Sequence, residues 1–446
     1  MYTAPAKRPV ICSPHPTETL DPAVLHSFFL AVVLAAVHSV AGARAIEPAA
    51  RTLTVGDGVE IPLTRYAAPG ERALLWLPSE SGILEQERHL AARLAGRGVE
   101  VWLADLHGAY FLAPVESSID RVPAGDIAQL IAHVRRETGK RVHLVAAGRG
   151  ALLALRGARA WQREAHAGPL GGVVLISPKL FAETPEPGRD GDLVPVVRAS
   201  DLPIFVLQPA KSPWRWQLDR TAPALAEGGS DVYLRILPDV RDRFYFRPDA
   251  VAQEDLMAQR LPGLIRQTLP LLAAYAGKPR RPPAQVEAGA PAPPGKRERT
   301  LREYKGDPRP PPLGLEGLDG RVHGLDDYRG GVVLVNFWAS WCPPCVHEMP
   351  SMQRLKEWLA GRPFTILAVN MAEERETIEA FLRDKVNVDF TVLLDRDGRA
   401  LKRWKVFAFP TSYVVDRRGR IRYALFGAIA WDAPDVIAKM EELLAE

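Results

Sequence analysis

The stretch Val332-Val-Leu-Val-Asn-Phe-Trp-Ala-Ser-Trp-Cys-Pro-Pro-Cys-Val-His-Glu-Met-Pro350 changes its hydrophobic period halfway along. Its first half is a continuous apolar run of strand length, rich in β-branched residues, whereas the part after Trp341 has helical spacing. Cys342 stands at the junction, so we expect this cysteine at the N-terminus of a helix. The helix dipole favours a thiolate there and can lower a cysteine pKa from about 8.5 to roughly 3.5–7.5.

Cys345 follows one helical turn after Cys342, close enough for the two sulfurs to form a disulfide. Such a pair can cycle between dithiol and disulfide through a mixed disulfide with a partner. Two other interpretations of this spacing are weaker. A zinc site needs further ligands, and beyond Cys345 the chain offers only His347. A structural disulfide in so short a loop removes little entropy from the unfolded chain. Redox chemistry without a metal or cofactor is therefore favoured.

The segment Val335–Cys345, followed by Glu348-Met349-Pro350, resembles the active site of TlpA/ResA-type thioredoxin-like proteins. These are membrane-bound or exported thiol-disulfide oxidoreductases of bacteria. The resemblance runs from about Pro312 to Glu446 and includes Gly317-Leu-Asp-Gly-Arg321 and Phe409-Pro410-Thr411. It implies a thioredoxin-like domain at residues 313–446.

The resemblance also implies roles for single residues. Cys342 would exchange bonds with the partner, Cys345 would resolve the mixed disulfide, and the two would form a redox-active disulfide. Pro410 would be a cis-proline beside the cysteines, and a cis X-Pro bond costs only about 0.5–1 kcal/mol. Trp341, Phe409 and Pro410 are the expected substrate-binding residues.

Two departures from ordinary thioredoxin concern the buried acid. Asn336 stands where thioredoxin has a buried aspartate, and Glu348 matches a buried glutamate of ResA-like proteins. A carboxyl desolvated beside a sulfur has a raised pKa and can move a proton to or from Cys345. The alternative is a glutamate on the helix surface. Pro343 and Pro344 remove two amide donors from the Cys342 sulfur, which favours a moderately reducing couple.

The first 45 residues have the pattern of an export signal. Lys7 and Arg8 precede the apolar core Leu25–Val37, and Ala43-Arg44-Ala45 is a small-x-small cleavage site. We expect cleavage after Ala45 and a periplasmic protein; an uncleaved membrane anchor is the alternative. Cleavage would discard the third cysteine of the chain and leave a C-x-x-C pair that cannot mispair in an oxidising compartment.

Residues 46–276 alternate short apolar runs with helical stretches, which predicts a mostly parallel sheet covered on both faces, a three-layer α/β domain. The strands expected are Ala73–Leu77, Val99–Ala104, Val142–Ala146, Gly172–Ile176, Ile204–Gln208 and Val232–Leu237. The helices expected are Leu84–Leu94, Gly125–Glu137, Arg149–Trp161 and Ala252–Tyr275.

This order resembles the α/β-hydrolase fold. The run Ala146-Ala-Gly-Arg-Gly150 occupies the place of the G-x-S-x-G nucleophile elbow, with Gly148 at the serine position. No histidine lies between His166 and His323, so the base is missing too. We therefore expect a hydrolase-like domain without hydrolase activity, in which the aromatic residues Trp214, Trp216 and Phe244–Phe246 either line a binding site or pack in the core.

Residues 277–312 read as a Pro-rich basic linker that tethers the two domains. The segment 278–312 holds ten prolines and nine Lys/Arg against four Asp/Glu, whereas the whole chain of 446 residues has a net charge of only +4. The folded parts therefore give no electrostatic argument for nucleic-acid binding. In residues 313–446 the strands expected are Val332–Trp338, Phe364–Asn370, Phe390–Leu394, Thr411–Val415 and Ile421–Leu425, with a hairpin near Leu315–Val322 and helices at 344–360, Glu374–Lys385 and Pro434–Leu444.

The leading hypothesis is an exported thiol-disulfide oxidoreductase that reduces disulfides of periplasmic proteins, with electrons from a membrane thiol reductase. Two alternatives remain open. The hydrolase-like domain could be a binding module that recruits a ligand or a protein partner, or the chain could be a hydrolase with a redox appendage.

Overall fold

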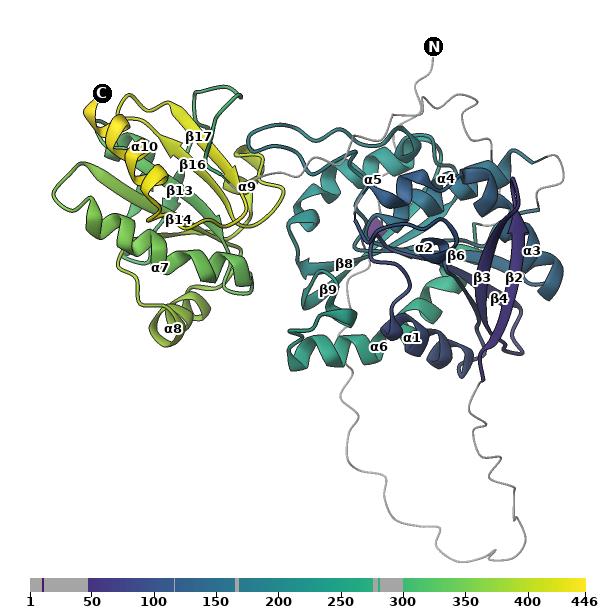
Figure 1. Ribbon diagram of the computed structural model, residues 1–446. Coiled ribbons are helices and arrows are strands. Elements are labelled where there is room, and N and C mark those ends of the chain that lie inside the picture. Colours follow the sequence, from purple (N-terminus) through teal and green to yellow (C-terminus); the bar gives the residue numbers. More distant parts are fainter. Residues whose placement is uncertain (1–9, 12–46, 116, 165–167, 276–279, 281–299) are drawn as a thin grey trace, which may run out of the picture.

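The computed structural model describes residues 10–11, 47–115, 117–164, 168–275, 280 and 300–446. They form two α/β units side by side, each built on its own sheet (Figure 1). The expected signal segment 1–45 lies outside the described residues, apart from the two-residue strand β1 (Val10–Ile11). In the part of the chain that is described, no helix is both long and apolar enough to cross a membrane.

The N-terminal unit contains a nine-stranded sheet in the order β1-β9-β8-β7-β6-β4-β5-β3-β2. The strands from β5 to β9 run parallel, and β2 and β3 form an antiparallel hairpin beside β5. This hairpin was not among the predicted strands, because its residues alternate with polar, exposed side chains instead of forming a continuous apolar run. The strands are β2 (Ala49–Val55), β3 (Val59–Tyr66), β4 (Arg72–Leu77), β5 (Glu100–Ala104), β6 (Arg141–Ala147), β7 (Gly172–Ile176), β8 (Pro203–Lys211) and β9 (Asp231–Arg241).

Helices cover both faces of this sheet, and inner strands such as β5 and β7 are therefore buried at every residue. Side chains of α1 and α6 pack in one core cluster, and those of α3, α4 and α5 pack in another. The mixed α/β architecture is confirmed. The helices are α1 (Glu85–Ala95), α2 (Leu106–Ala109), α3 (Ala124–Thr138), α4 (Gly150–Gln162), α5 (Leu218–Glu227) and α6 (Ala252–Ala273), with 3₁₀ turns η1 (Ser118–Arg121), η2 (Pro195–Val197), η3 (Pro213–Gln217) and η4 (Phe244–Phe246).

The C-terminal unit has the predicted thioredoxin-like order around a six-stranded sheet, β10-β17-β16-β13-β14-β15. The central strand β13 pairs parallel with β14 and antiparallel with β16. The elements are β10 (Arg302–Glu303), β11 (Gly314–Glu316), β12 (Val322–Gly324), η5 (Leu325–Tyr328), β13 (Val332–Trp338), α7 (Pro343–Trp358), β14 (Phe364–Met371), α8 (Arg375–Lys385), β15 (Thr391–Asp395), α9 (Arg399–Arg403), β16 (Thr411–Val415), β17 (Ile421–Phe426) and α10 (Pro434–Ala445).

The boundary between linker and C-terminal domain differs from the expected residue 313. Leu301 is 3% exposed and belongs to the core of the C-terminal unit. Strand β10 pairs with β17, and the Tyr304 amide donates to the Arg422 carbonyl (2.8 Å). The surrounding prolines and charges concealed this short strand. The two units also contact one another directly, which the expectation of a simple tether did not include.

Leu301→Ala tests this boundary. Removing a buried leucine side chain should lower the free energy of unfolding of the C-terminal unit by about 2–5 kcal/mol. Calorimetry on the full chain should show its transition at lower temperature, with the N-terminal transition unchanged. Glu303→Ala, at an exposed site two residues on, is the matched control. Equal melting of both variants would place Leu301 in an unpacked linker.

Candidate active site

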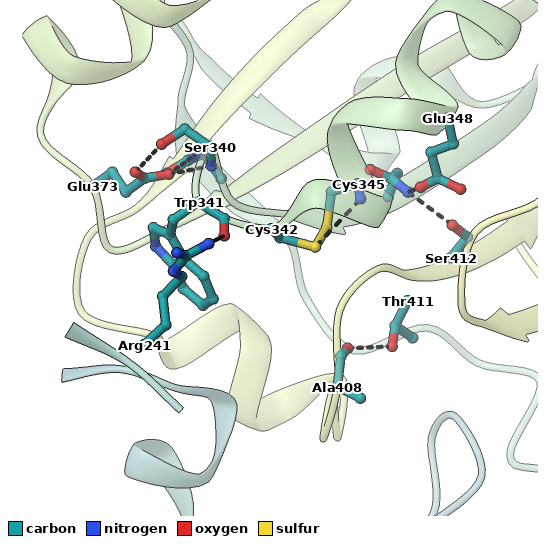
Figure 2. Close-up of a disulfide and its surroundings, with 12 residues drawn as sticks. Arg241, Ser340, Trp341, Cys342, Cys345, Glu348, Glu373, Ala408, Thr411 and Ser412 are labelled. Atoms are coloured by element: carbon teal, nitrogen blue, oxygen red, sulfur yellow. Dashed lines mark hydrogen bonds between the residues drawn. A yellow bond between two sulfur atoms is a disulfide. The ribbon is translucent and has the colours of Figure 1, made fainter. Parts of the chain in front are cut away.

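The cysteine pair lies where α7 begins, directly after the buried strand β13. Cys342 is the N-cap of α7, and Pro343 and Pro344 occupy its first two positions. Proline fits there because the amides of the first turn have no partner within the helix. The two sulfurs form a disulfide with a Cα–Cα distance of 5.3 Å (Figure 2). Cys342 is 6% exposed and Cys345 is fully buried. The outer sulfur therefore belongs to Cys342, so this is the sulfur that a partner can reach first.

One backbone donor remains beside the outer sulfur. The Cys345 amide donates to Cys342 Sγ (3.3 Å), while the two prolines contribute no N–H. The N-terminal end of α7 adds its partial positive charge. Thiolate formation at Cys342 is thus supported by the helix, but by fewer direct hydrogen bonds than an ordinary helix N-terminus provides.

The loop before β16 lies next to the pair. The Phe409–Pro410 peptide bond is cis. The Phe409 ring contacts the Trp341 ring edge-to-face, with centroids 5.7 Å apart. Two hydrogen bonds hold the loop, from the Gly427 amide to the Pro410 carbonyl (2.9 Å) and from Thr411 Oγ1 to the Ala408 carbonyl (2.7 Å; Figure 2). Trp341, next to Cys342 in the chain, thus contacts Phe409, and Pro410 follows Phe409 in the same loop.

Glu348 is buried, not on the helix surface, since the residue is only 2% exposed. Burial raises the pKa of Glu348 to about 7, although hydrogen bonds to its carboxylate work against that shift. Asn336 Nδ2 donates to Oε1 (2.8 Å), and Trp431 Nε1 donates to Oε2 (3.1 Å). Asn336 also donates to Ser412 Oγ (2.9 Å), so it ties the acid to strand β16. Trp431 and Ser412 were missed, since nothing near them in the sequence marks them as partners of the acid.

A second carboxylate holds the loop that precedes Cys342. The Ser340 amide donates to Glu373 Oε2 (2.7 Å), and Asn370 Nδ2 donates to the same oxygen (2.9 Å). Figure 2 shows Glu373 on the opposite side of the disulfide from Glu348. Sequence reasoning missed Glu373 as well, because it lies in a charged segment that reads as an ordinary helix start. Among the described residues, no cluster of His, Cys, Asp and Glu could hold a metal ion.

A carboxylate lies against the sharp turn between β6 and α4 of the N-terminal unit. Gly148 has a φ of +55° in the sharp turn between β6 and α4, and a Cβ added there would lie 2.6 Å from Glu80 Oε2. Glu80 accepts hydrogen bonds from the Arg149 amide (3.0 Å), Lys179 (2.8 Å) and Arg243 (2.8 Å). Burial alone would raise the pKa of Glu80, but these partners lower it to about 2. Glu80 is therefore ionised at neutral pH.

The segments that follow strands β8 and β9 carry no histidine. Asp242, directly after β9, accepts hydrogen bonds from Ser177 and from Ser212 Oγ (2.8 Å). The cavity beside Gly148, Glu80 and Asp242 holds only about 20 Å³. Of the aromatic residues considered from sequence, Phe244 and Tyr245 pack in the core of this unit, whereas Trp214 and Trp216 contact the C-terminal unit.

Glu348→Gln tests the pKa of the buried acid. The folded state raises the carboxyl pKa from 4.5 to about 7, so the folded protein binds the proton more tightly than the unfolded chain does. Stability should therefore fall as the pH rises from 4.5 to about 7, by about 3 kcal/mol, and stay reduced above that range. Urea denaturation of the oxidised protein measures this.

The glutamine variant should lack this component of the pH dependence, while Glu357→Gln, at an exposed site on the same helix, should retain it. Parallel pH profiles for wild type and Glu348→Gln would contradict a raised pKa at this carboxyl.

The comparisons with known proteins concern the C-terminal unit. The AhpC/TSA family profile matches residues 308–424. ResA of Geobacillus thermodenitrificans, a thiol-disulfide oxidoreductase, is 35% identical over 119 residues, which cover 27% of this chain and 68% of ResA. The thioredoxin-like protein YneN of Bacillus subtilis is 36% identical over 114 residues, which cover 25% of this chain and 66% of YneN.

Among solved structures, a protein provisionally named thiol:disulfide interchange protein DsbE, from Chlorobium tepidum, aligns with 32% of this chain and 99% of its own. The sequence identity is 30% and the TM-score is 0.30. The ResA match covers more than two thirds of that relative, and the family profile spans the cysteine pair and the elements that hold it. Through its C-terminal unit, the chain belongs to the ResA family of thiol-disulfide oxidoreductases, enzymes with a thioredoxin-like fold.

Proposed function

We propose that this enzyme is exported and reduces disulfides of periplasmic proteins through the Cys342–Cys345 pair. The observation that carries the proposal is the asymmetry of the pair. One sulfur lies at a helix N-terminus at the mouth of the site, the other is buried one turn along, and a buried acid stands one turn further. Attack on the substrate, resolution of the mixed disulfide and proton transfer are then each assigned to one residue.

The reaction begins from the dithiol. The Cys342 thiolate attacks a substrate disulfide, and the substrate sulfur that leaves takes up a proton. Cys345 then loses its proton and attacks Cys342 in the mixed disulfide, which releases the second substrate thiol and forms the disulfide seen here. Two electrons pass from the cysteine pair to the substrate.

Glu348 is proposed to move the proton of Cys345. The two residues are three positions apart on α7 and therefore lie on the same face of the helix. With a pKa near 7, the carboxyl exchanges protons readily at neutral pH, which is the condition for an efficient general base or acid. Trp341, Phe409 and Pro410 are proposed to contact the substrate.

The oxidised pair must be reduced again before the next turnover. We propose a membrane thiol reductase as the electron donor, and the periplasm as the location. The export-signal pattern in residues 1–45 supports this, since cleavage after Ala45 would leave Cys342 and Cys345 as the only cysteines of the mature chain. The alternative in which the signal is retained as an anchor keeps the same chemistry.

The N-terminal unit is proposed to be a degenerate α/β-hydrolase-like domain. The strand, sharp turn and helix around Gly148 support this, since they have the form of a nucleophile elbow. Glu80 occupies the space above the elbow and accepts the Arg149 N–H, the donor that would stabilise an oxyanion in an active hydrolase. An anion held there permanently leaves no place for an ester.

With Cys342→Ser, the rate at which dithiothreitol reduces insulin should fall to the rate measured without enzyme, because the variant has no outer thiolate. Cys345→Ala should instead accumulate a mixed disulfide with the substrate, visible by mass spectrometry as an adduct that dithiothreitol removes. Retained turnover in Cys342→Ser would reject the mechanism.

The full chain should not hydrolyse p-nitrophenyl acetate above the rate of a heat-denatured sample, because the elbow has neither nucleophile nor base. Saturable turnover that is lost in Ser177→Ala or Ser79→Ala would support the hydrolase alternative, since these are the serines beside the small cavity.

A further inference from the structure

Phe407 joins the two units of the chain. It belongs to the loop that leads from α9 to Pro410, and it is only 4% exposed. Its ring contacts come from the N-terminal unit, where Phe181 lies 5.4 Å away and Trp214 lies 6.3 Å away between centroids. Phe181 and Trp214 also contact each other (5.7 Å). We refer to these three residues as the interdomain aromatic cluster.

Charged residues flank this cluster with complementary signs. Lys402 forms an ion pair with Asp219, and Lys405 forms one with Asp190 (2.7 Å). Exposed ion pairs of this kind are each worth little. Together with the aromatic cluster, however, they define one orientation of the two units, because both lysines lie on the C-terminal unit and both aspartates on the N-terminal one.

A second contact reaches the loop directly before the cysteine pair. Arg241 Nη1 lies 3.5 Å from the carbonyl oxygen of Trp341, the residue before Cys342 (Figure 2). The guanidinium is held in place by Glu254 (2.6 and 2.7 Å) and by Asp249 (3.1 Å). The N-terminal unit therefore presents a rigid, fully paired side chain to the loop that carries the outer cysteine.

All these contacts arise at one edge of the N-terminal sheet. Phe181 follows β7, Trp214 follows β8, and Arg241 ends β9, so they share the carboxyl edge of parallel strands. That edge is where open α/β sheets bind their ligands. Here the space beside the elbow is closed, and the edge contacts the cysteine-bearing unit instead.

The docked units leave a groove of about 360 Å³ that reaches Pro344 at the start of α7 and the loop of the cis-proline. Glu186 and Arg189 of the N-terminal unit line it together with Pro344, Phe409 and Pro410, and most of the remaining lining comes from residues 300–306 and 424–428 of the C-terminal unit. This volume lies at the low end for a pocket that binds a ligand. A folded protein surface needs about 800 Å² on each partner for a specific complex, which requires an open face. The groove therefore fits a short extended chain.

We propose that the N-terminal unit, docked through the interdomain aromatic cluster, restricts which substrates reach Cys342. It admits extended cysteine-bearing segments of unfolded proteins and excludes folded protein surfaces. This inference rests on the proposed reduction of protein disulfides. It assigns to the degenerate domain a role in substrate choice that needs no catalytic residue of its own.

The test uses the full chain and a variant altered only in the N-terminal unit, Trp214→Ala/Asp190→Lys/Asp219→Lys. Small-angle scattering should show a larger radius of gyration. With dithiothreitol as reductant, the rate on folded insulin should rise about three- to tenfold, the range set by the loss of an aromatic contact. The rate on an unstructured peptide with one disulfide should stay within about twofold.

Two controls make the result specific. Glu227→Lys, the same charge reversal at an exposed ion pair with Arg198 inside the N-terminal unit, should leave the size and both rates unchanged. Adding Lys402→Asp and Lys405→Asp to the opened variant should restore the ion pairs with reversed sign and lower the insulin rate again.

Two results would overturn the proposal. If the opened variant has the same ratio of peptide to insulin rates as wild type, the N-terminal unit does not select between the two substrates. A triple variant as compact as wild type would show that these contacts do not hold the units together. The proposed reduction itself is tested separately with Cys342→Ser. If wild type reduces neither substrate faster than Cys342→Ser does, that proposed function is wrong.

Discussion

The burial of strand β13 is the constraint on which the redox site depends. All seven residues of β13 are buried, and strands β14 and β16 pair with it on either side. The strand therefore cannot shift its register without moving apolar residues out of the core. Because the strand is held, the start of α7 is held too, and Cys342 stays at the helix N-terminus with the Cys345 amide on its sulfur.

The same buried environment explains the exchange of acid positions relative to ordinary thioredoxin. Asn336 lies on β13 and donates to the Glu348 carboxylate from 2.8 Å. An aspartate at that position would place a second carboxyl against the first, and two like charges so close cannot both ionise. A neutral donor instead orients the single acid, and burial raises its pKa to about 7 against the opposing effect of these hydrogen bonds.

In the N-terminal unit, ionic pairing has a different consequence. Glu80 is as deeply buried as Glu348, but Lys179 and Arg243 neutralise it, so its pKa is lowered to about 2. One buried glutamate is thus suited to exchange protons, whereas the other is a permanent anion in the space above Gly148. The difference lies in the cations nearby and not in the depth of burial.

Much of this architecture could be predicted from local pattern. Long apolar runs located β13 and β7 to the residue, and the helical period located α7 and α10 within a residue or two. The hairpin β2–β3 and strand β10 could not be found in this way, since their side chains are partly exposed and pair with distant segments that no local period reveals.

The sequence by itself determined the chemistry: two cysteines at a strand-to-helix junction, an acid one turn further, and a glycine where a hydrolase would have its serine. Only the tertiary structure decided which groups surround them. Trp431, Ser412 and Glu373 approach the site from other elements, and Phe407 meets Phe181 from across the chain. These contacts depend on long-range packing, because desolvation and pairing are set by neighbours in space and not by neighbours along the chain.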